Sequence, residues 1–265
     1  MAAAVSESRT LKIVREPKVY LVGRQMVNDE EISRFLADEE RTWETDTEVG
    51  AEKLAEIAGR VCYMSYGKGR KTNEAFLSHL IEVGHGSVLE HGVWSFVFTG
   101  VSRSFTHELI RHRHFSYSQL SQRYVDESDS DFVEPDVIAD DPELHAAWTD
   151  AVNAARLGYD RLVAGLETRF GDIADKTLRR KMARQAARSV LPNATETKIF
   201  VTANARALRH FIELRGSEHA DVEIRKVAVE VLRIMQKEAP NMFADYTLVP
   251  LADGSLATHT DHVKI

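Results

Sequence analysis

The sequence predicts an α+β fold: a single domain with an antiparallel-type sheet packed by several long helices. Its 265 residues, 43% of them hydrophobic, are enough to bury one sizeable core. Segments with apolar residues at helical spacing are mixed with runs of aromatic and β-branched residues that are typical of strands. No stretch is rich enough in Pro, Gly or Ser to divide the chain, so one domain is expected.

The predicted domain lies between two polar ends. Residues 1–16 are expected to be a disordered terminus, residues 17–251 to form the domain, and residues 252–265 to form a polar tail. The stretch from Asn28 to Glu48 is rich in Asp and Glu, so a solvated helix or loop is expected there.

Four segments are predicted to be strands. The best is Val93–Val101, which reads Val-Trp-Ser-Phe-Val-Phe-Thr-Gly-Val and combines aromatic with β-branched residues. The weaker candidates are residues 19–23, 195–203 and 243–251.

Seven segments are predicted to be helices, because their apolar residues recur every three or four positions. They cover residues 51–63, 72–84, 104–112, 142–170, 175–191, 204–215 and 221–237. Gly84 is placed as a C-terminal cap, Pro192 ends the helix before it, and Asp221 is suited to be an N-cap. The helix at 104–112 should bury one face and present a cationic face with Arg103, His107 and Arg111.

Composition narrows the classes of function. The formal charge is −7 at pH 7, which argues against a general nucleic-acid coat protein, because phosphate-binding domains are usually basic. No apolar run reaches the roughly 20 residues of a membrane-spanning helix, and Met1–Glu7 lacks the features of a secretory signal. The chain is therefore expected to be cytoplasmic, with no nucleic-acid and no membrane partner.

The single cysteine, Cys62, excludes an internal disulfide and a cysteine zinc cluster. It lies in a mostly apolar predicted helix, so we expect a buried, inert side chain rather than a nucleophile. Glu82–His85 is one Glu-x-x-His motif without a second copy, and His112 and His114 stand beside two arginines. No metal site is expected.

The most informative stretch is Arg111–Tyr124, which reads Arg-His-Arg-His-Phe-Ser-Tyr-Ser-Gln-Leu-Ser-Gln-Arg-Tyr. Its guanidinium, imidazole, hydroxyl and amide groups suit a ligand with several anionic oxygens, above all a phosphate. Taken alone, this stretch is equally open to interpretation as a solvated helix end.

Further cationic clusters lie at residues 179–188 and on the helix predicted at 204–215, with Arg206, Arg209, His210 and Arg215. Each cluster alone can be a solvated basic face. The turn Gly84–Ser87 can bring backbone N–H groups to an anion, or it can simply end a helix. Together, several cationic patches in an acidic domain indicate one or two polyanionic ligands.

Arg111-His112-Arg113, followed after seven residues by Ser121, resembles the signature of the flavin-dependent thymidylate synthases (ThyX family). The resemblance covers roughly residues 51–251 and includes, in the family's order, Gly84–His91, Gln122–Tyr124, Arg188–Pro192 and Arg209–Arg215. It implies a homotetramer with shared active sites and FAD as the cofactor. The implied methyltransferase reaction converts dUMP to dTMP, with 5,10-methylenetetrahydrofolate as carbon donor and NADPH as reductant.

The resemblance also implies roles for individual residues. The implied FAD site consists of Ser87, Arg111, His112, Arg113, Gln119, Asn204, Ala205, Arg206 and His210, with His85 as a weaker candidate. The implied dUMP site consists of Glu108, Leu109, Ile110, Arg111, Gln119, Leu120, Ser121, Gln122, Arg123, Arg188 and Arg215, with Arg103 and Lys181 less secure. Some relatives carry glutamine where this chain has Glu108.

Arg215 is implied to be the catalytic residue. A guanidinium beside uracil would favour ionisation at N3, an electrostatic task that requires no cysteine nucleophile. Two rival functions remain open from the residues themselves. One is a single-strand nucleic-acid binding module, because aromatic and cationic residues alternate between Arg113 and Tyr124. The other is a flavin oxidoreductase that is unrelated to nucleotides.

Overall fold

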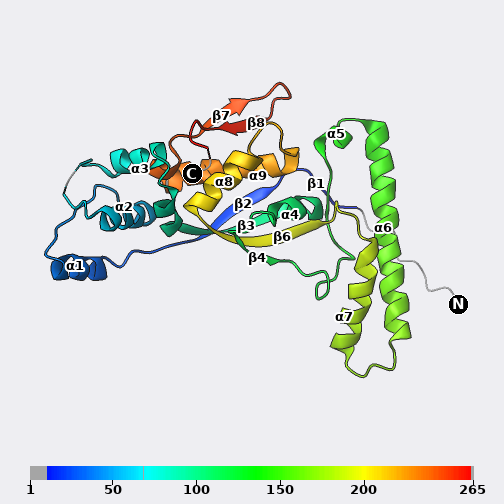
Figure 1. The fold of residues 1–265 in the computed structure, drawn as a ribbon. Helices are drawn as coiled ribbons and strands as arrows, with labels where there is room; N and C mark the ends of the chain where they lie inside the picture. The colour runs from blue at the N-terminus through cyan, green and yellow to red at the C-terminus, as the bar shows by residue number, and fades with distance from the viewer. Residues whose placement is uncertain (1–10, 68, 264–265) are drawn as a thin grey trace. The chain divides into compact units, whose positions relative to one another are not determined.

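A computed structural model describes residues 11–67 and 69–263 of the chain (Figure 1). The chain folds into two compact units. Unit 1 contains the chain up to Lys18, Phe98–His107 and Ser118–Ile199, and unit 2 contains Val19–Val97, Glu108–Tyr117 and the chain from Phe200 onward. Most of the terminus predicted to be disordered, residues 1–10, lies outside the described residues.

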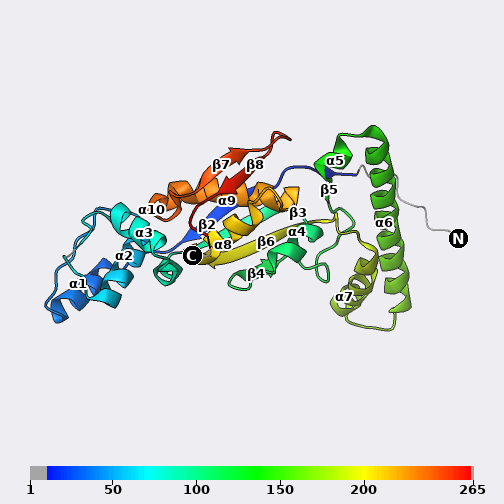
Figure 2. The ribbon, with the colours of Figure 1, turned by 45° about the horizontal axis from the view of Figure 1, so that its top comes forward.

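The predicted α+β class is confirmed, because the chain forms a four-stranded antiparallel sheet and several helices (Figures 1 and 2). The strand order is β2 (Lys18–Arg24), β3 (Val93–Ser102), β6 (Glu196–Asn204) and β4 (Ser116–Gln119). Backbone hydrogen bonds from Arg103 to Thr195 and from Ala205 to Gly92 join opposite ends of β3 and β6, so these two strands run antiparallel.

Strand β3 follows the predicted alternation between a buried and a half-buried face. In unit 2 its buried residues are Trp94 and Phe96, and the helices α8 (Ala205–Arg215) and α9 (Val222–Glu238) pack against each other in the same unit. The buried face of α8 carries Leu208, Phe211 and Ile212 at the helical spacing. Burial of this stripe leaves the polar side of α8 free for other contacts.

The first helices of unit 2 are α1 (Asp29–Asp38), α2 (Gly50–Tyr63) and α3 (Asn73–Glu82), followed by the 3₁₀ helix η1 (Gly86–His91). The Thr72 hydroxyl caps α3 by accepting from the backbone N of Ala75 at 3.2 Å. Gly84 follows the helix with φ of +74°, a conformation that favours glycine, so its predicted place at the helix end is confirmed.

Unit 1 is mainly a pair of long helices. These are α6 (Pro142–Arg169) and α7 (Lys176–Ala187), which pack together and are joined by a short connection (Figure 1). Asp141 and Asp175 cap their N-termini through side-chain oxygens. The smaller elements of unit 1 are α5 (Asp136–Ala139), η2 (Arg188–Val190), and a parallel pair of β1 (Ile13–Val14) with β5 (Phe132–Val133).

Several predicted boundaries were wrong. The helix expected at 104–112 is α4 (Arg103–Leu109), so Arg111 lies beyond its end and cannot share a helical face with Arg103 and His107. The helix expected to reach 191 ends at Ala187 and continues as the tighter η2. The strand β4 was not predicted, because its polar sequence Ser-Tyr-Ser-Gln lacks an apolar alternation.

Two short strands lie in segments where none was predicted. Ile13 and Val14 form β1 because their backbones pair with residues 132 and 133, which are far away in sequence. The last strand expected at 243–251 is divided into α10 (Pro240–Phe243) and β7 (Thr247–Pro250). Residues expected to be a polar tail contain β8 (Leu256–His259), which pairs antiparallel with β7.

Candidate active site

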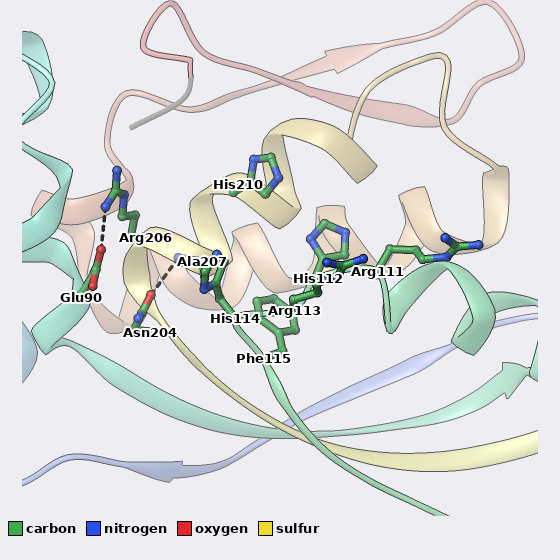
Figure 3. A pocket seen from close by; sticks show the side chains of 10 residues that line it. All are labelled: Glu90, Arg111, His112, Arg113, His114, Phe115, Asn204, Arg206, Ala207 and His210. Atoms are coloured by element: carbon green, nitrogen blue, oxygen red, sulfur yellow. Dashed lines mark hydrogen bonds and ion pairs between the residues drawn. The ribbon is translucent and has the colours of Figure 1, made fainter.

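Unit 2 contains a cavity of about 560 Å³ (Figure 3). Its lining comes from three segments: η1, the loop after α4, and the β6–α8 junction with the first half of α8. The lining residues are Glu90, Arg111, His112, Arg113, His114, Phe115, Asn204, Arg206, Ala207 and His210. Three arginines and three histidines therefore surround one space. They come from two segments that lie nearly 100 residues apart in sequence.

Local structure explains how these side chains are held. The loop after α4 is folded back by Tyr117, whose hydroxyl lies 2.7 Å from the Leu109 carbonyl oxygen and 2.8 Å from that of His112. Burial raises the pKa of the Tyr117 hydroxyl, so it remains a neutral donor. On the opposite segment, the Asn204 side chain caps α8 by accepting from the backbone N of Ala207 at 2.8 Å.

His112 and Phe115 are the buried residues of this loop, whereas Arg111, Arg113 and His114 are exposed. The His112 ring lies 5.2 Å from the Phe211 ring and 5.6 Å from the Phe115 ring, measured between centroids. The cavity therefore has a partly aromatic floor and a cationic rim. That combination suits a ligand with a flat ring and anionic groups.

His112 is held in its neutral form. Burial lowers its pKa to about 4, and the positive charges of Arg215 and His210 act in the same direction. The neutral ring accepts a hydrogen bond from Arg215, whose Nε lies 3.2 Å from Nε2 of His112. Because Nε2 is the acceptor, the ring proton is assigned to Nδ1.

Arg215, the last residue of α8, is fixed from two sides. Its Nη1 donates to the Glu108 carboxylate at 2.6 Å, and its Nη2 reaches the Glu108 backbone oxygen at 3.3 Å. With the bond to His112, three of the five guanidinium N–H donors have partners among the described residues, which leaves two for a ligand. The arginine is therefore rigid, charged and still able to bind an anionic group.

The charge balance of the cavity favours an anion. Its one carboxylate, Glu90, is already paired with Arg206 at 2.6 Å. Arg111 and Arg113 have no carboxylate partner among the described residues, and both are exposed at the rim. A dinucleotide with a pyrophosphate group and aromatic rings suits this donor set, so the residues present are compatible with FAD.

Apart from Leu109 and Ile110, the remaining predicted dUMP residues belong to unit 1. In that unit the Nε atoms of Arg103 and Arg123 are buried without a hydrogen-bond partner. Burial lowers the pKa of Arg103, and the nearby charges of Glu127 and Arg188 act in opposite directions. Arg188 is exposed and its guanidinium makes no hydrogen bond within the described chain. Unpaired buried donors of this kind are candidates for contact with a phosphate.

Other predicted contacts of unit 1 are used inside the protein. The Gln119 side chain donates to Thr106 at 3.1 Å, and the Leu120 backbone oxygen accepts from Arg103 at 2.8 Å. Ser121 accepts from the backbone N of Arg123, and Gln122 is half-buried beside it. Lys181 lies over the exposed Tyr124 ring, 4.8 Å from its centroid.

Not every predicted FAD residue of unit 2 lines the cavity. Six of them do: Arg111, His112, Arg113, Asn204, Arg206 and His210. Ala205 is instead fully buried, and its backbone N donates to Gly92. Ser87 and Ile110 are exposed, Leu109 is in the core, and His85 stacks on Tyr63 and bonds its hydroxyl at 3.0 Å.

Sequence reasoning missed four lining residues: Glu90, His114, Phe115 and Ala207. Three of them lie inside motifs that had been singled out, so adjacency was the available signal. Cys62 was expected to be buried, but it is exposed at the end of α2, because that turn of the helix faces away from the core. Cys62 is not among the residues that line the cavity.

Two kinds of feature are absent from the part of the chain that the structure describes. No helix there is both long and apolar enough to cross a membrane. Within the same ranges, no group of three or more His, Cys, Asp or Glu side chains is placed to hold a metal ion.

Comparisons with known proteins identify the family. Residues 45–241 match the family described as "Thymidylate synthase complementing protein". A flavin-dependent thymidylate synthase of Mycolicibacterium vanbaalenii is 56% identical over 226 residues, which cover 84% of this chain and 90% of the relative. The enzyme of the same name from Mycobacterium tuberculosis (strain H37Ra) is 57% identical over 224 residues, 83% of this chain and 89% of the relative.

A solved structure has the same fold. The UMP/dUMP methylase PolB from Streptomyces cacaoi, bound with 5-Br UMP, aligns with a TM-score of 0.63. The alignment covers 88% of this chain and 95% of PolB, at 22% sequence identity, so it speaks for the fold alone. Residues 45–241 match the family model, and both relatives share more than half of their aligned residues with this chain. This chain therefore belongs to the flavin-dependent thymidylate synthases.

Proposed function

We propose that this chain methylates dUMP to dTMP with FAD as its cofactor, 5,10-methylenetetrahydrofolate as the carbon donor and NADPH as the reductant. The observation that carries the proposal is Arg215, a charged and doubly anchored guanidinium that retains two donors for a ligand. Family membership supports the reaction class, and the chemistry of the cavity supports the ligands.

FAD would be held by the residues that line the cavity of unit 2. Arg111 and Arg113 would bind the pyrophosphate, because planar guanidinium groups form paired hydrogen bonds with phosphate oxygens. His112, His210 and Asn204 would contact the rest of the cofactor. When bound, FAD supplies the hydride that reduces the transferred carbon to a methyl group.

The phosphate of dUMP would be bound by arginines and hydroxyls of the segment after β4 and of η2. Arg123 and Arg188 offer guanidinium donors that the described chain does not use fully, and Ser121 and Gln122 add neutral donors. Charged donors give the larger share of affinity for a phosphate dianion, because their hydrogen bonds are charge-assisted.

Arg215 would lie against the uracil ring. Carbon transfer needs a nucleophilic C5, and negative charge that develops at N3 and over the ring makes C5 more nucleophilic. A fixed guanidinium stabilises that charge without reorganisation, because Glu108 and His112 already hold it in place. His112 is neutral and accepts from Arg215, so it helps to orient the guanidinium without adding a second positive charge beside it.

This mechanism assigns no step to Cys62. A cysteine-dependent route would need a thiolate against the pyrimidine, and Cys62 is exposed and outside the cavity lining. We further propose a cytoplasmic homotetramer with shared active sites. That assignment rests on the family alone.

The central test is Arg215→Ala, assayed for dTMP formation from dUMP with all three cofactors and cosubstrates present. We expect a loss of about 10²–10³-fold in kcat, the size seen when a preorganised charge-stabilising donor is removed. Arg233→Ala is the matched control, because Arg233 is an exposed arginine of α9 that pairs with Glu230. Unchanged turnover in Arg215→Ala, with the control also unchanged, would reject the proposed role.

A spectrum separates this function from its rivals. The purified chain should show flavin absorbance, and added dUMP should perturb it. Oligonucleotide affinity without flavin absorbance would favour a nucleic-acid binding module instead. NADPH oxidation that is indifferent to dUMP would favour an unrelated oxidoreductase.

A further inference from the structure

Helix α8 carries functional side chains on one side and is held on the other. Arg206 and His210 line the cavity (Figure 3). Arg215 ends the helix and bonds His112 and Glu108. The opposite side contacts the last part of the chain, residues 245–260, at two levels. The proposed function gives no role to this C-terminal part.

The first level is an ion pair at the middle of α8. Arg209 is 1% exposed, and its guanidinium donates to the Asp245 carboxylate at 2.6 and 2.7 Å. Asp245 also accepts from the Thr260 hydroxyl at 2.5 Å. The Tyr246 hydroxyl donates to the Arg209 backbone oxygen at 2.9 Å. Both ends of the C-terminal hairpin are thus tied to one turn of α8.

The second level lies at the end of α8, next to Arg215. The Thr258 hydroxyl of β8 donates to the Ile212 backbone oxygen at 2.9 Å, and its backbone N donates to the Gly216 oxygen at 2.8 Å. Gly216 is buried, and a Cβ there would overlap Thr258 Oγ1 and lie 2.7 Å from Thr258 Cγ2. The strand therefore approaches the residue after Arg215 as closely as only a glycine permits.

Arg225 of α9 holds the turn of the hairpin and the loop that follows Arg215. It is 4% exposed, and its Nη1 donates to the Glu218 oxygen at 2.9 Å. Its Nη2 donates to Ser255 at 3.0 Å. The chain that leaves α8 and the hairpin are thus fixed to the same buried guanidinium.

We propose that the C-terminal hairpin β7–β8 is a positioning element for Arg215, acting through the contact of Thr258 with Gly216 and Ile212. This inference rests on the role proposed for Arg215. Thr258 and Gly216 touch no ligand in this scheme. They determine where α8 ends and hence where the guanidinium of the next residue lies. A small displacement of that group costs catalysis far more than it costs folding.

Two variants displace the hairpin and two test its specificity. Gly216→Ala places a methyl group where Thr258 stands, and Thr258→Val replaces the hydroxyl with a methyl group that repels the Ile212 oxygen. Thr258→Ser keeps the hydroxyl and is the conservative rescue. His259→Ala is the control, because His259 is the exposed neighbour on β8 and its partner Asp261 is also exposed.

Each variant is purified with flavin, and the pH dependence of kcat for dTMP formation is measured together with KM for dUMP. Arg215 lowers the pH at which N3 ionises, so its displacement should move the rate midpoint to higher pH. We expect this shift and a loss of about tenfold or more in kcat for Gly216→Ala, with a smaller loss for Thr258→Val, because misplacing a catalytic group by about 1 Å costs up to 10²-fold. KM for dUMP should change little.

The rescue and the control complete the test. Thr258→Ser and His259→Ala should keep the wild-type midpoint, and adding Thr258→Ala to Gly216→Ala should restore part of the shift. If Gly216→Ala does not fold, Thr258→Val carries the test. A wild-type midpoint in Gly216→Ala and Thr258→Val, whether or not kcat falls, overturns the inference.

Arg215→Ala in the same assay separates the two proposals. If Arg215→Ala moves the midpoint and the hairpin variants do not, only the positioning role fails. If Arg215→Ala itself leaves the midpoint and kcat unchanged, the role proposed for Arg215 fails first.

Discussion

Two polar clusters of unit 2 differ in how fully their side chains are used. The first is a buried network between α2, α3 and the segment at residues 43–47. At its centre, Glu56 is 1% exposed and accepts hydrogen bonds from Arg60, Thr45 and Asn73. The second is the cationic cavity together with Arg215, which contacts the lining residue His112. Arg215 keeps two unused donors, and Arg111 and Arg113 have no carboxylate partner among the described residues.

The pKa values of the two carboxylates in the buried network show how burial and hydrogen bonding compete. Burial alone would raise the pKa of Glu56, but hydrogen bonds from Thr45, Asn73 and Arg60 together lower the pKa below its usual range. Glu52 also accepts several bonds, yet burial dominates there and raises its pKa. Polar groups that serve folding are thus matched within the chain, since an unpaired buried charge is costly.

The cavity follows the opposite rule. Its donors exceed its acceptors, and the excess remains near the surface, where water satisfies it until a ligand arrives. A cluster of arginines and histidines therefore indicates a binding site when its donors have no hydrogen-bond partner within the protein. The acidic stretch Asn28–Glu48, predicted to be a solvated helix or loop, contains Trp43 and Thr45, whose side chains donate to Glu56. It is therefore in part structural.

The largest effect on folding is expected from Glu56→Gln. The variant leaves Arg60 buried without its charge partner, so the free energy of unfolding should fall by about 3–5 kcal/mol. Denaturant unfolding measures the change, and Glu74→Gln is the exposed control on the neighbouring helix. A loss below about 1 kcal/mol would show that the network contributes little beyond ordinary polar contacts.

The next effect concerns pH. Because the pKa of His112 is lowered from 6.5 to about 4 on folding, the unfolded chain binds a proton first as pH falls. The stability of the wild type should therefore decrease between pH 6.5 and about 4 by up to about 3 kcal/mol relative to His112→Gln, which cannot titrate. Gln offers an amide oxygen to Arg215 in place of Nε2. Equal pH dependence in both proteins would contradict the assignment of His112 as a buried neutral ring.

A smaller effect is expected at the cavity rim. Arg206→Ala removes a partly exposed cation whose pairing with Glu90 is screened by solvent, so flavin retention should weaken by less than about tenfold.

His112→Ala should weaken flavin retention more than dUMP binding. Flavin absorbance after gel filtration and dUMP titration measure the two effects. We expect His112→Ala to lose more flavin than Arg206→Ala. The opposite order would contradict the larger contribution expected from the buried His112.

The smallest effect is expected from Cys62→Ala. Cys62 is exposed and outside the cavity lining, so both stability and turnover should stay close to wild type, within about 0.5 kcal/mol for unfolding. Loss of turnover in a folded, flavin-loaded variant would point to a cysteine nucleophile and would replace the proposed mechanism.

Local patterns predicted much of the secondary structure and many candidate residues. Alternation predicted β3, helical spacing predicted α2, α8 and α9, and the Arg-His-Arg motif supplied three of the ten residues that line the cavity. These features depend on neighbours within about four residues, which the sequence displays directly. The prediction that Asp221 is the N-cap of α9 is confirmed, since its side chain accepts a hydrogen bond from the backbone N of Glu223. This prediction too depended only on neighbouring residues.

Features that depend on distant partners were not predictable. Ile13 and Val14 form a strand because residues 132–133 pair with them. Part of the predicted polar tail forms β8 because it pairs with β7 and donates a hydrogen bond to α8. Arg209 and Arg215 are both arginines of α8, and only the fold buries the first against Asp245 and leaves the second half-buried beside His112 and Glu108.

The sequence by itself therefore determined the α+β class, the main helices and strands, and the presence of a donor-rich motif. Tertiary structure alone decided which donors are consumed by the fold and which remain for a ligand. The physical reason is that hydrogen-bond satisfaction and burial are properties of groups brought together from distant positions, whereas periodicity and capping are properties of adjacent residues.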